Sequence, residues 1–376
     1  MPSIRCVAFT WNTANQNVPK EAPIQMASYI KSKRPHLVIV NLQETVRTWG
    51  GEFVSERIAK RLDYNIYTED KNGNRRKEKL SYLPLMQDQM GVITKCSKKN
   101  FVNDVSGYTH LAIYVRSDLC QIKGSIGARN GYKLDRVSKK HRINIIAKGV
   151  VRDGSLFKKR ATRNKGGLYA CLEVFGHPLV VVGAHLDSNH EDNRLREVNE
   201  LCRAAENEAS KYIQKHRTKF RSWDDNNQRI PSLIFMGDLN ERLVPTPMSS
   251  LKNTLNNRNG LPDSFFINNY DPISRNEVPH FRDQGVTFES TEYMTYEERF
   301  DEKDEKKGKG RSGEVMFKPK RNGKPDAGAL DNIGFRDDER RFNSLDIQVH
   351  ELLTVKGDKI SDHRGVTRDF EFSINH

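Results

Sequence analysis

Closely spaced cysteine pairs are missing from this sequence of 376 residues. It contains five cysteines, and no two of them have the spacing of zinc ligands: they are Cys6, Cys96, Cys120, Cys171 and Cys202. Because the cysteines are odd in number and scattered, we expect neither a framework of disulfide bridges nor a structural zinc site. The cysteine content indicates a reducing compartment, and the cytoplasm is the predicted location.

Long apolar stretches are missing as well. No run approaches the roughly 18 residues that a membrane-spanning helix needs. Residues 1–5 lead directly into a strand-like run, without the apolar region of a signal peptide. We therefore expect no transmembrane segment and no export signal, but a soluble protein that can visit a membrane at its periphery.

Positive charge is what the sequence has in excess. The chain has 63 lysines and arginines against 49 aspartates and glutamates, which gives a formal net charge of +14 at pH 7. A field of this sign attracts polyanions, namely nucleic acid, an anionic membrane surface or a multiply phosphorylated small molecule. Charge alone does not choose among the three, and solubility is a further explanation.

Short apolar runs with β-branched residues recur along the chain, and each is closed by a polar residue or a turn. Their length and flanks predict strands that are buried on both faces. These runs span residues 4–9, 37–42, 111–115, 168–174, 179–183 and 232–236. Helical patterns at 23–33 and 193–216 separate some of them. The alternation of strands and helices, together with adjacent strand pairs, predicts an α/β sandwich with helices outside.

The helical pattern at 193–216 is the stronger of the two. Its apolar side chains fall on one stripe that consists of Leu195, Val198, Leu201, Ala205, Ala209, Tyr212 and Ile213. Asp192 precedes the pattern and is the predicted N-cap.

Three charged segments are predicted to be surface insertions in a single domain that spans residues 1–376. Residues 69–79 are interpreted as a charged loop, and 125–163 as a basic hairpin around a strand-like run at 143–151. Residues 295–324 carry acidic and then basic blocks with several glycines, so they cannot bury much apolar surface.

Side chains that bind metals or phosphates end nearly every predicted strand. In α/β folds the chemistry lies at such positions, because a rigid sheet holds the loops that follow its strands. One such residue would mean little, but five strand ends of this kind predict a common site. The residues are Asn12, Glu44, His185, Asp238 with Asn240, and Asp362 with His363.

Metal-assisted phosphoester hydrolysis accounts for these residue types. Mg²⁺ prefers oxygen ligands and keeps several waters, so Glu44 and Asn12 are predicted to hold it. Hydrolysis also needs a base for water and donors for the charge on the phosphate. Asp238 suits the first role, and Asn240 is a donor beside it.

Two histidines are predicted to donate to the phosphate as imidazolium groups. His185 and His363 fit this role if a carboxylate orients the ring. Asp331, which lies in Leu330-Asp331-Asn332-Ile333, is the predicted partner. Asp362 is predicted to contact the metal through water or to fix its loop.

Taken together, the motifs resemble those of the endonuclease/exonuclease/phosphatase superfamily, whose fold is DNase I-like, and most closely the inositol polyphosphate 5-phosphatases. Gln43-Glu44, Gly237-Asp238-Leu239-Asn240 and Ser361-Asp362-His363 resemble motifs shared by nucleases, sphingomyelinases and phosphatases. Closer to the 5-phosphatases are Thr10-Trp11-Asn12 with Gln16, Asn164-Lys165-Gly166-Gly167, and the extension of the aspartate motif to Arg242.

The resemblance implies a four-layer α/β sandwich, dependence on Mg²⁺, and removal of the 5-phosphate from phosphoinositides or soluble inositol phosphates. It places Glu44 and Asn12 at the metal and assigns water activation to Asp238. Contact with the scissile phosphate is implied for His185, Asn240 and His363, with support for His363 from Asp331. It also implies substrate binding by Asn164, Lys165 and Arg242, since two glycines let the backbone approach a phosphate while a lysine supplies charge.

The sequence departs from the family just before Asp331. The family's Pro-Ala-Trp-Cys-Asp-Arg-Ile stretch occurs here as residues 327–333, which keep the aspartate but lack the Trp, Cys and Arg. The residues that read a neighbouring ring phosphate usually lie just upstream, where Lys320 and Arg321, with Lys318 and Lys324, are the candidates. The general chemistry is thus better indicated than the preferred inositol phosphate.

Three other functions remain open. A nuclease of the same superfamily agrees with the positive charge, although nucleic acid fits the Asn164–Gly167 segment less well than an inositol phosphate does. A sphingomyelinase-type phosphodiesterase shares much of the framework. A binding protein with an inactive site could dock on acidic membranes, but it would not need Glu44, Asp238 and His363. A monomer is expected.

Overall fold

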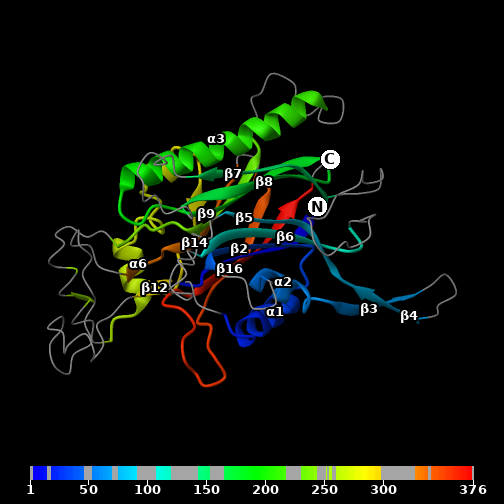
Figure 1. Cartoon of the computed structure of the whole chain (residues 1–376), viewed down its shortest axis with the longest axis horizontal. Helices are drawn as coiled ribbons and strands as arrows, with labels where there is room; N and C mark the ends of the chain where they lie inside the picture. The colour runs from blue at the N-terminus through cyan, green and yellow to red at the C-terminus, as the bar shows by residue number, and fades with distance from the viewer. Residues whose placement is uncertain are drawn as a thin grey trace, which may run out of the picture.

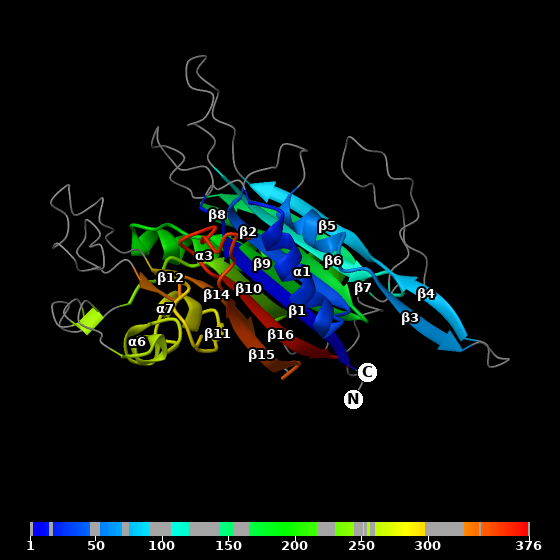
Figure 2. The ribbon, with the colours of Figure 1, turned by 90° about the horizontal axis from the view of Figure 1, so that it is seen from below.

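The structure, a computed structural model, describes residues 3–14, 18–45, 53–69, 75–90, 107–119, 143–152, 165–216, 230–243, 251, 254–255, 260–297, 327–337 and 340–374. Two six-stranded sheets pack face to face, and helices cover both outer faces (Figure 1). Figure 2 shows the same sandwich from below, with the strands of the two sheets stacked over one another. The predicted four-layer, DNase I-like α/β sandwich is therefore confirmed.

The first sheet has the chain's first strand near its centre. Its order is β15 (Phe342–His350), β16 (Gly365–Ser373), β1 (Ser3–Asn12), β2 (Leu37–Thr45), β6 (Tyr108–Arg116) and β5 (Tyr82–Met90). Only β1 and β2 run parallel, and the other four neighbouring pairs are antiparallel.

The second sheet repeats this series of strand directions. Its order is β11 (Thr287–Phe288), β14 (Asp331–Arg336), β10 (Ser232–Asp238), β9 (His177–His185), β8 (Gly166–Val174) and β7 (Ile143–Arg152). Here β10 and β9 are the parallel pair. Each sheet therefore has two central strands whose carboxyl ends lie at the same edge.

The main core lies between the sheets. Ile4, Cys6 and Ala8 of β1 belong to the same buried cluster as Ile234 and Met236 of β10. The alternate residues of β1 pack on the opposite face, in a cluster with side chains of α1 (Glu21–Lys33) and α2 (Val54–Ala59). The strand is thus buried on both faces, as its continuous apolar run predicts.

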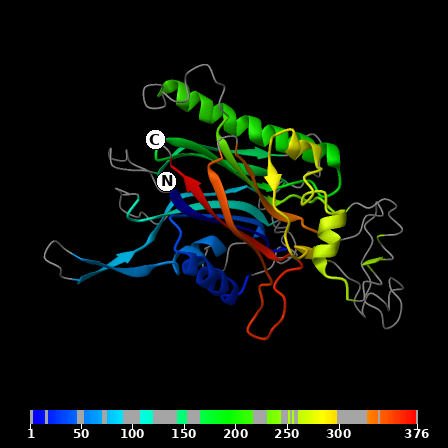
Figure 3. The same cartoon turned by 180° about the vertical axis from the view of Figure 1, so that it is seen from behind.

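The long helix α3 (Glu191–Lys215) covers the second sheet, as Figures 1 and 3 show from opposite sides. It begins two residues before the predicted start, and its N-cap residue is His190 instead of Asp192. Asp187 organises this helix start, because its carboxylate accepts from the backbone N–H groups of Asn189 and His190 at 2.6 and 2.9 Å. Leu195, which the sequence places on the apolar stripe, is 39% exposed.

The charged segments have more regular structure than predicted. Residues 69–79, expected to be a loop, contribute to an antiparallel hairpin of β3 (Tyr64–Glu69) and β4 (Arg75–Leu80). The strand expected at 143–151 is β7, an edge strand of the second sheet that pairs antiparallel with β8. The rest of the predicted basic hairpin, residues 125–142 and 153–163, lies outside the described residues. Of the segment 295–324, only residues 295–297 are described, and they include β12 (Tyr296–Glu297), which pairs with β13 (Ala327–Gly328).

Two short helices, α6 (Asp263–Tyr270) and α7 (Pro279–Arg282), follow β10 in the chain. Across the described residues, none of the helices combines the length and the apolar composition needed to cross a membrane. The three described cysteines, Cys6, Cys171 and Cys202, are buried free thiols.

The two ends of the described chain lie side by side, as the marks in Figures 1 and 3 indicate. Ser3 of β1 pairs with Ser373 of β16, and the pairing continues to Thr10 and Val366.

Candidate active site

Strand pairing places three of the predicted site residues next to one another. In the second sheet Asp238 pairs with His185 on the parallel strand β9 and with Asp331 on the antiparallel strand β14. In the first sheet Asn12 lies beside Gln43, directly before Glu44. The site is thus located where the central strands of both sheets end.

Asp238 links the two sheets. Its Oδ2 accepts a hydrogen bond of 2.9 Å from Nδ2 of Asn12, and its Oδ1 accepts one of 3.1 Å from the backbone N–H of Asn240. The Nε2 atom of His185 lies 3.4 Å from Oδ2. Burial opposes ionisation, but His185 and the positive charges of His363 and Lys165 hold the pKa of Asp238 well below its usual range. The carboxylate is therefore ionised at neutral pH.

The backbone around Asp238 permits only glycine at the preceding position. Gly237 has a φ of +146°, and a Cβ atom added there would lie 2.0 Å from the carbonyl oxygen of Ala184. This close approach brings β10 and β9 together just before Asp238. On the other side of Asp238, Nδ2 of Asn240 donates to the carbonyl oxygen of Leu186 at 2.9 Å, which ties the two loops after these strands.

His363 and Asp331 form a buried pair beside Asp238. The Nδ1 atom of His363 lies 2.6 Å from Oδ2 of Asp331. Burial lowers the pKa of His363, but the charge and hydrogen bond of Asp331 outweigh burial and raise it to about 9. His363 is thus an imidazolium at neutral pH, and Asp331 is its partner as predicted.

Two residues that sequence reasoning missed hold this pair. The hydroxyl of Thr295 accepts from the backbone N–H of Asp331 at 2.9 Å. The indole N–H of Trp11 donates to the carbonyl oxygen of His363 at 3.2 Å. In the sequence, Trp11 stands out only as part of the Thr10-Trp11-Asn12 motif. Thr295 lies at the start of a charged segment, where the sequence gives no sign of a buried residue.

His185 differs from the predicted imidazolium. It is buried, and its Nε2 atom contacts the ammonium of Lys165. Burial, and then the charge of Lys165, lower the pKa of His185 against the effect of Asp238, so the ring is neutral at pH 7. Burial also lowers the pKa of Lys165, although the carboxylates of Asp238 and Glu44 act in the opposite sense.

Glu44 lies near His185 and is partly exposed to solvent. Its Oε1 atom is 3.7 Å from Nε2 of His185, its side chain is 27% exposed, and its backbone has a φ of 49° at the end of β2. The Oδ1 atom of Asn12 accepts from the backbone N–H of Ala14 at 2.9 Å. Within the described part of the chain, no three His, Cys, Asp or Glu side chains gather as a metal site. A hard cation that retains its waters needs fewer ligands, and an accessible carboxylate beside an amide oxygen suits it.

The remaining predicted residues have other contacts or lie outside the described residues. Arg242 is buried, with its guanidinium carbon 5.2 Å from the ring centre of Tyr296. Asp362 is exposed and accepts from Ser361 at 3.4 Å, so its role at a metal remains a prediction. Asn164, Lys320 and Arg321 lie outside the described residues, as do Gln16, Lys318 and Lys324.

A buried ionic network that the sequence did not reveal lies behind the site. Arg194 of α3 donates from Nε to Oε1 of Glu241 at 2.6 Å, and His280 of α7 lies 3.3 Å from the same oxygen. Arg194 also donates to the carbonyl oxygen of Asp187 at 3.2 Å. The network therefore joins the loop after His185 to the loop after Asp238. In the sequence, the only sign of a role for Glu241 is its place next to the Gly237–Asn240 motif.

Comparison with known proteins agrees with the architecture. A sequence model of Endonuclease/Exonuclease/phosphatase family 2 matches residues 9–369. No curated protein sequence matches the chain. Among solved structures, the inositol polyphosphate 5-phosphatase domain of SPsynaptojanin, in complex with inositol (1,4)-bisphosphate and calcium ion, is similar. It has 12% identity over 99% of this chain and 84% of its own, with a TM-score of 0.51.

Two further solved structures were matched. The ferrous NO complex of Cimex nitrophorin has 12% identity, full coverage of both chains and a TM-score of 0.50. TDP2 from D. rerio, complexed with a single-strand DNA product, has 12% identity over 97% of this chain and 98% of its own, with a TM-score of 0.41. At such identities the likeness concerns the fold alone, and function has to be argued from the site.

Proposed function

Because the chain belongs to the endonuclease/exonuclease/phosphatase family, we propose that it hydrolyses a phosphoric ester with the help of a divalent cation. The observation that carries this proposal is the position of Asp238, whose carboxylate accepts a hydrogen bond from Asn12 of the opposite sheet at 2.9 Å and lies 3.4 Å from His185. The His363–Asp331 pair beside it supplies an imidazolium. An ionised carboxylate and fixed cationic donors around one point are what phosphoester hydrolysis requires.

We assign the orientation and deprotonation of the attacking water to Asp238. Both of its oxygens are held by hydrogen bonds, which fix the direction of the lone pairs that remain. Nδ1 of His363 is hydrogen-bonded to Asp331. We therefore assign to its Nε2–H group the hydrogen bond to a phosphate oxygen. Nε2 of neutral His185 contacts the ammonium of Lys165, which orients the ammonium and leaves it protons for the phosphate.

Glu44 and Asn12 are the residues that would hold Mg²⁺. The oxygen of Asn12 that accepts from Ala14 has a second lone pair, so both interactions are compatible. When bound, the cation would polarise the phosphoryl oxygens and offset the charge that develops on them. This chemistry complements the cationic donors His363 and Lys165.

The finer proposal is that the substrate is an inositol phosphate or phosphoinositide that loses its 5-phosphate. It is supported by the motifs at residues 10–12, 164–167 and 237–242, which resemble those of the 5-phosphatases. The similar SPsynaptojanin domain, which is an inositol polyphosphate 5-phosphatase, agrees with it in fold.

A nuclease is the second candidate, because a net charge of +14 suits a nucleic acid as well as an inositol phosphate. A substrate panel separates the two. Purified protein is incubated with inositol 1,4,5-trisphosphate, phosphoinositide vesicles, sphingomyelin vesicles and single-stranded DNA, each with Mg²⁺ and with EDTA. We expect Mg²⁺-dependent phosphate release from the inositol compounds alone. Cleavage of DNA would favour the nuclease, and inactivity on all substrates would contradict the hydrolase.

A further inference from the structure

The backbone beside His363 is held by a short segment of the chain, the strand β12 with the residue before it. Tyr296 forms an antiparallel bridge with His363, and the backbone N–H of Arg364 donates to the carbonyl oxygen of Thr295 at 2.7 Å. On its other side β12 pairs with β13, where Tyr296 lies opposite Gly328. This segment therefore connects the loop of His363 to the residues that lead into β14.

The chain after β10 lies on the far side of β13. The backbone N–H of Leu243 donates to the carbonyl oxygen of Ala327 at 3.3 Å. Gly328, with a φ of +153°, permits this approach, because a Cβ atom there would lie 3.2 Å from the carbonyl oxygen of Glu241 and 3.4 Å from Cα of Arg242. The chain after β10, then β13, β12 and the loop before β16 thus lie side by side in this order.

The ring of Tyr296 contacts two side chains that come from opposite ends of this series. Its centre lies 4.6 Å from the centre of the His363 ring, with the two planes at 44°, and 5.2 Å from the guanidinium carbon of Arg242. These are the distances of packed aromatic rings and of a guanidinium over a ring face. Tyr296 is 7% exposed, so its ring is fixed by its surroundings.

The hydrogen bond to Asp331 leaves the ring of His363 one freedom. It holds Nδ1 at 2.6 Å from Oδ2 of Asp331, but a single hydrogen bond does not fix the direction in which Nε2 points. Rotation about the Cβ–Cγ bond of a histidine has broad minima, so this direction needs a second constraint. The ring of Tyr296, packed against the imidazole, supplies one.

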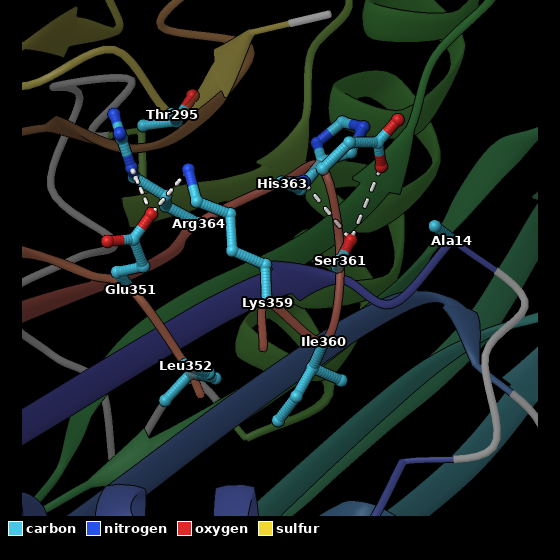
Figure 4. A pocket seen from close by; sticks show the side chains of 10 residues that line it. Ala14, Thr295, Glu351, Leu352, Lys359, Ile360, Ser361, His363 and Arg364 are labelled. Atoms are coloured by element: carbon cyan, nitrogen blue, oxygen red, sulfur yellow. Dashed lines mark hydrogen bonds and ion pairs between the residues drawn. The ribbon is translucent and has the colours of Figure 1, made fainter. Parts of the chain in front are cut away.

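His363 and Thr295 border a cavity of about 730 Å³, which Figure 4 shows. Tyr296 does not line this cavity, although its ring contacts His363. A ligand in the cavity therefore meets His363 directly, and an effect of Tyr296 on that ligand has to pass through His363.

We propose that Tyr296 is a positioning residue, whose ring fixes the direction of the Nε2–H group of His363 toward the scissile phosphate. The inference rests on the proposed phosphoesterase function, in which His363 donates to a phosphate oxygen. Positioning of this kind needs the aromatic ring of Tyr296 and not its hydroxyl group. Tyr296→Phe, which keeps the ring, should therefore differ from Tyr296→Leu, which removes it.

Steady-state kinetics with inositol 1,4,5-trisphosphate and Mg²⁺ test the proposal. Because a small misplacement of a catalytic group is costly, we expect Tyr296→Leu to lower kcat by about ten- to a hundredfold. KM should stay nearly unchanged, since Tyr296 does not line the cavity. Tyr296→Phe should restore the kcat of the unmodified protein. Equal losses in the two variants, or a loss that appears in KM alone, would overturn the proposal.

Tyr293→Leu is the matched control, because Tyr293 lies three residues earlier in the chain and is 53% exposed. Its kcat and KM should equal those of the unmodified protein. Thermal unfolding checks that Tyr296→Leu is folded. If that variant does not fold, the spectroscopic measurement on the unmodified protein and on Tyr296→Phe decides instead.

NMR spectroscopy of metal-free protein separates this proposal from the proposed function, because it requires no turnover. A nuclear Overhauser effect should connect the rings of Tyr296 and His363, and the ring current of Tyr296 should shift the carbon-bound ring protons of His363. Tyr296→Phe and Tyr293→Leu should keep this shift, and Tyr296→Leu should lose it. Hydrolysis of the trisphosphate without the Overhauser effect would support the function and reject the positioning role. The expected shifts in a protein that hydrolyses no substrate would support the ring contact and contradict the function.

Discussion

The carboxylate of Asp238 can be neutralised with little change in shape. Asp238→Asn keeps the volume of the side chain but removes the charge that would accept a proton from water. We expect kcat to fall about a thousandfold, the usual scale for loss of a general base, with Tm changed by only a few degrees. Steady-state kinetics and thermal unfolding check both parts.

Asp358→Asn is the control for this prediction, because Asp358 is exposed on the segment between β15 and β16. Its kcat should equal that of the unmodified protein. A kcat of Asp238→Asn within tenfold of the control would exclude Asp238 as the base.

A pH dependence follows from the raised pKa of His363. The ordinary pKa of 6.5 rises to about 9 in the folded protein, so the ring proton stabilises the fold. This contribution is fully present below pH 6.5 and is lost as the pH rises through 9. NMR titration of the His363 ring in metal-free protein should give a midpoint near 9, and Asp331→Asn should lower it. A midpoint below 7 in the unmodified protein would contradict the assigned pair.

At the scale of elements, the Arg194–Glu241–His280 network joins the loop that follows His185 to the loop that follows Asp238. Hydrogen bonds from His280 and Arg194 outweigh burial and lower the pKa of Glu241, so the glutamate is charged. Glu241→Gln would leave the guanidinium of Arg194 buried without its counter-charge. We expect a loss of about 3 kcal/mol in the free energy of unfolding, measured in urea.

The same substitution should also affect turnover if the network positions the loops. We expect kcat to fall while KM for the inositol phosphate changes little, because the network contacts the loops next to His185 and Asp238. Glu208→Gln, on the exposed side of α3, is the control. If the free energy of unfolding fell as expected but the kcat of the folded protein stayed normal, the network would have a structural role only.

Predictability from sequence differed among elements. Each of the six apolar runs lies inside a strand, because strands buried on both faces leave continuous apolar sequence. The edge strands β5 and β15 are only partly buried and have no such run. The predicted N-cap of α3 was wrong: the helix starts at Glu191, and Asp187 accepts from the backbone N–H groups of the two residues before it, Asn189 and His190.

The sequence predicted that certain side chains lie close together, but not how they contact one another. Motifs identified Asp238, His363 and Asp331, but the bond from Asn12 to Asp238 joins residues that are far apart in the chain and lie in different sheets. No local pattern encodes such a contact. The neutral state of His185 likewise depends on burial and on Lys165, which become known only from the packed structure.

At the scale of the whole molecule, the net charge of +14 should govern encounter with an anionic substrate. Raising NaCl from about 0.05 to about 0.5 M shortens the Debye length several-fold. We expect kcat/KM for inositol 1,4,5-trisphosphate to fall about tenfold, mostly through KM, while kcat stays nearly constant. A value of kcat/KM that does not change with salt would show that long-range attraction plays no part.

The pairing of Ser3 with Ser373 brings the two ends of the described chain together, which matters for protein engineering. The neighbouring ends lie at the amino end of β1, and Asn12 at its other end is nine steps away, or about 30 Å in an extended strand. A short linker could therefore join the two ends, and a circularly permuted chain opened at an exposed turn should refold with the same sheet edge at Asn12 and Asp238. For the same reason, a fluorescent protein or an affinity tag fused at either end should leave this edge accessible.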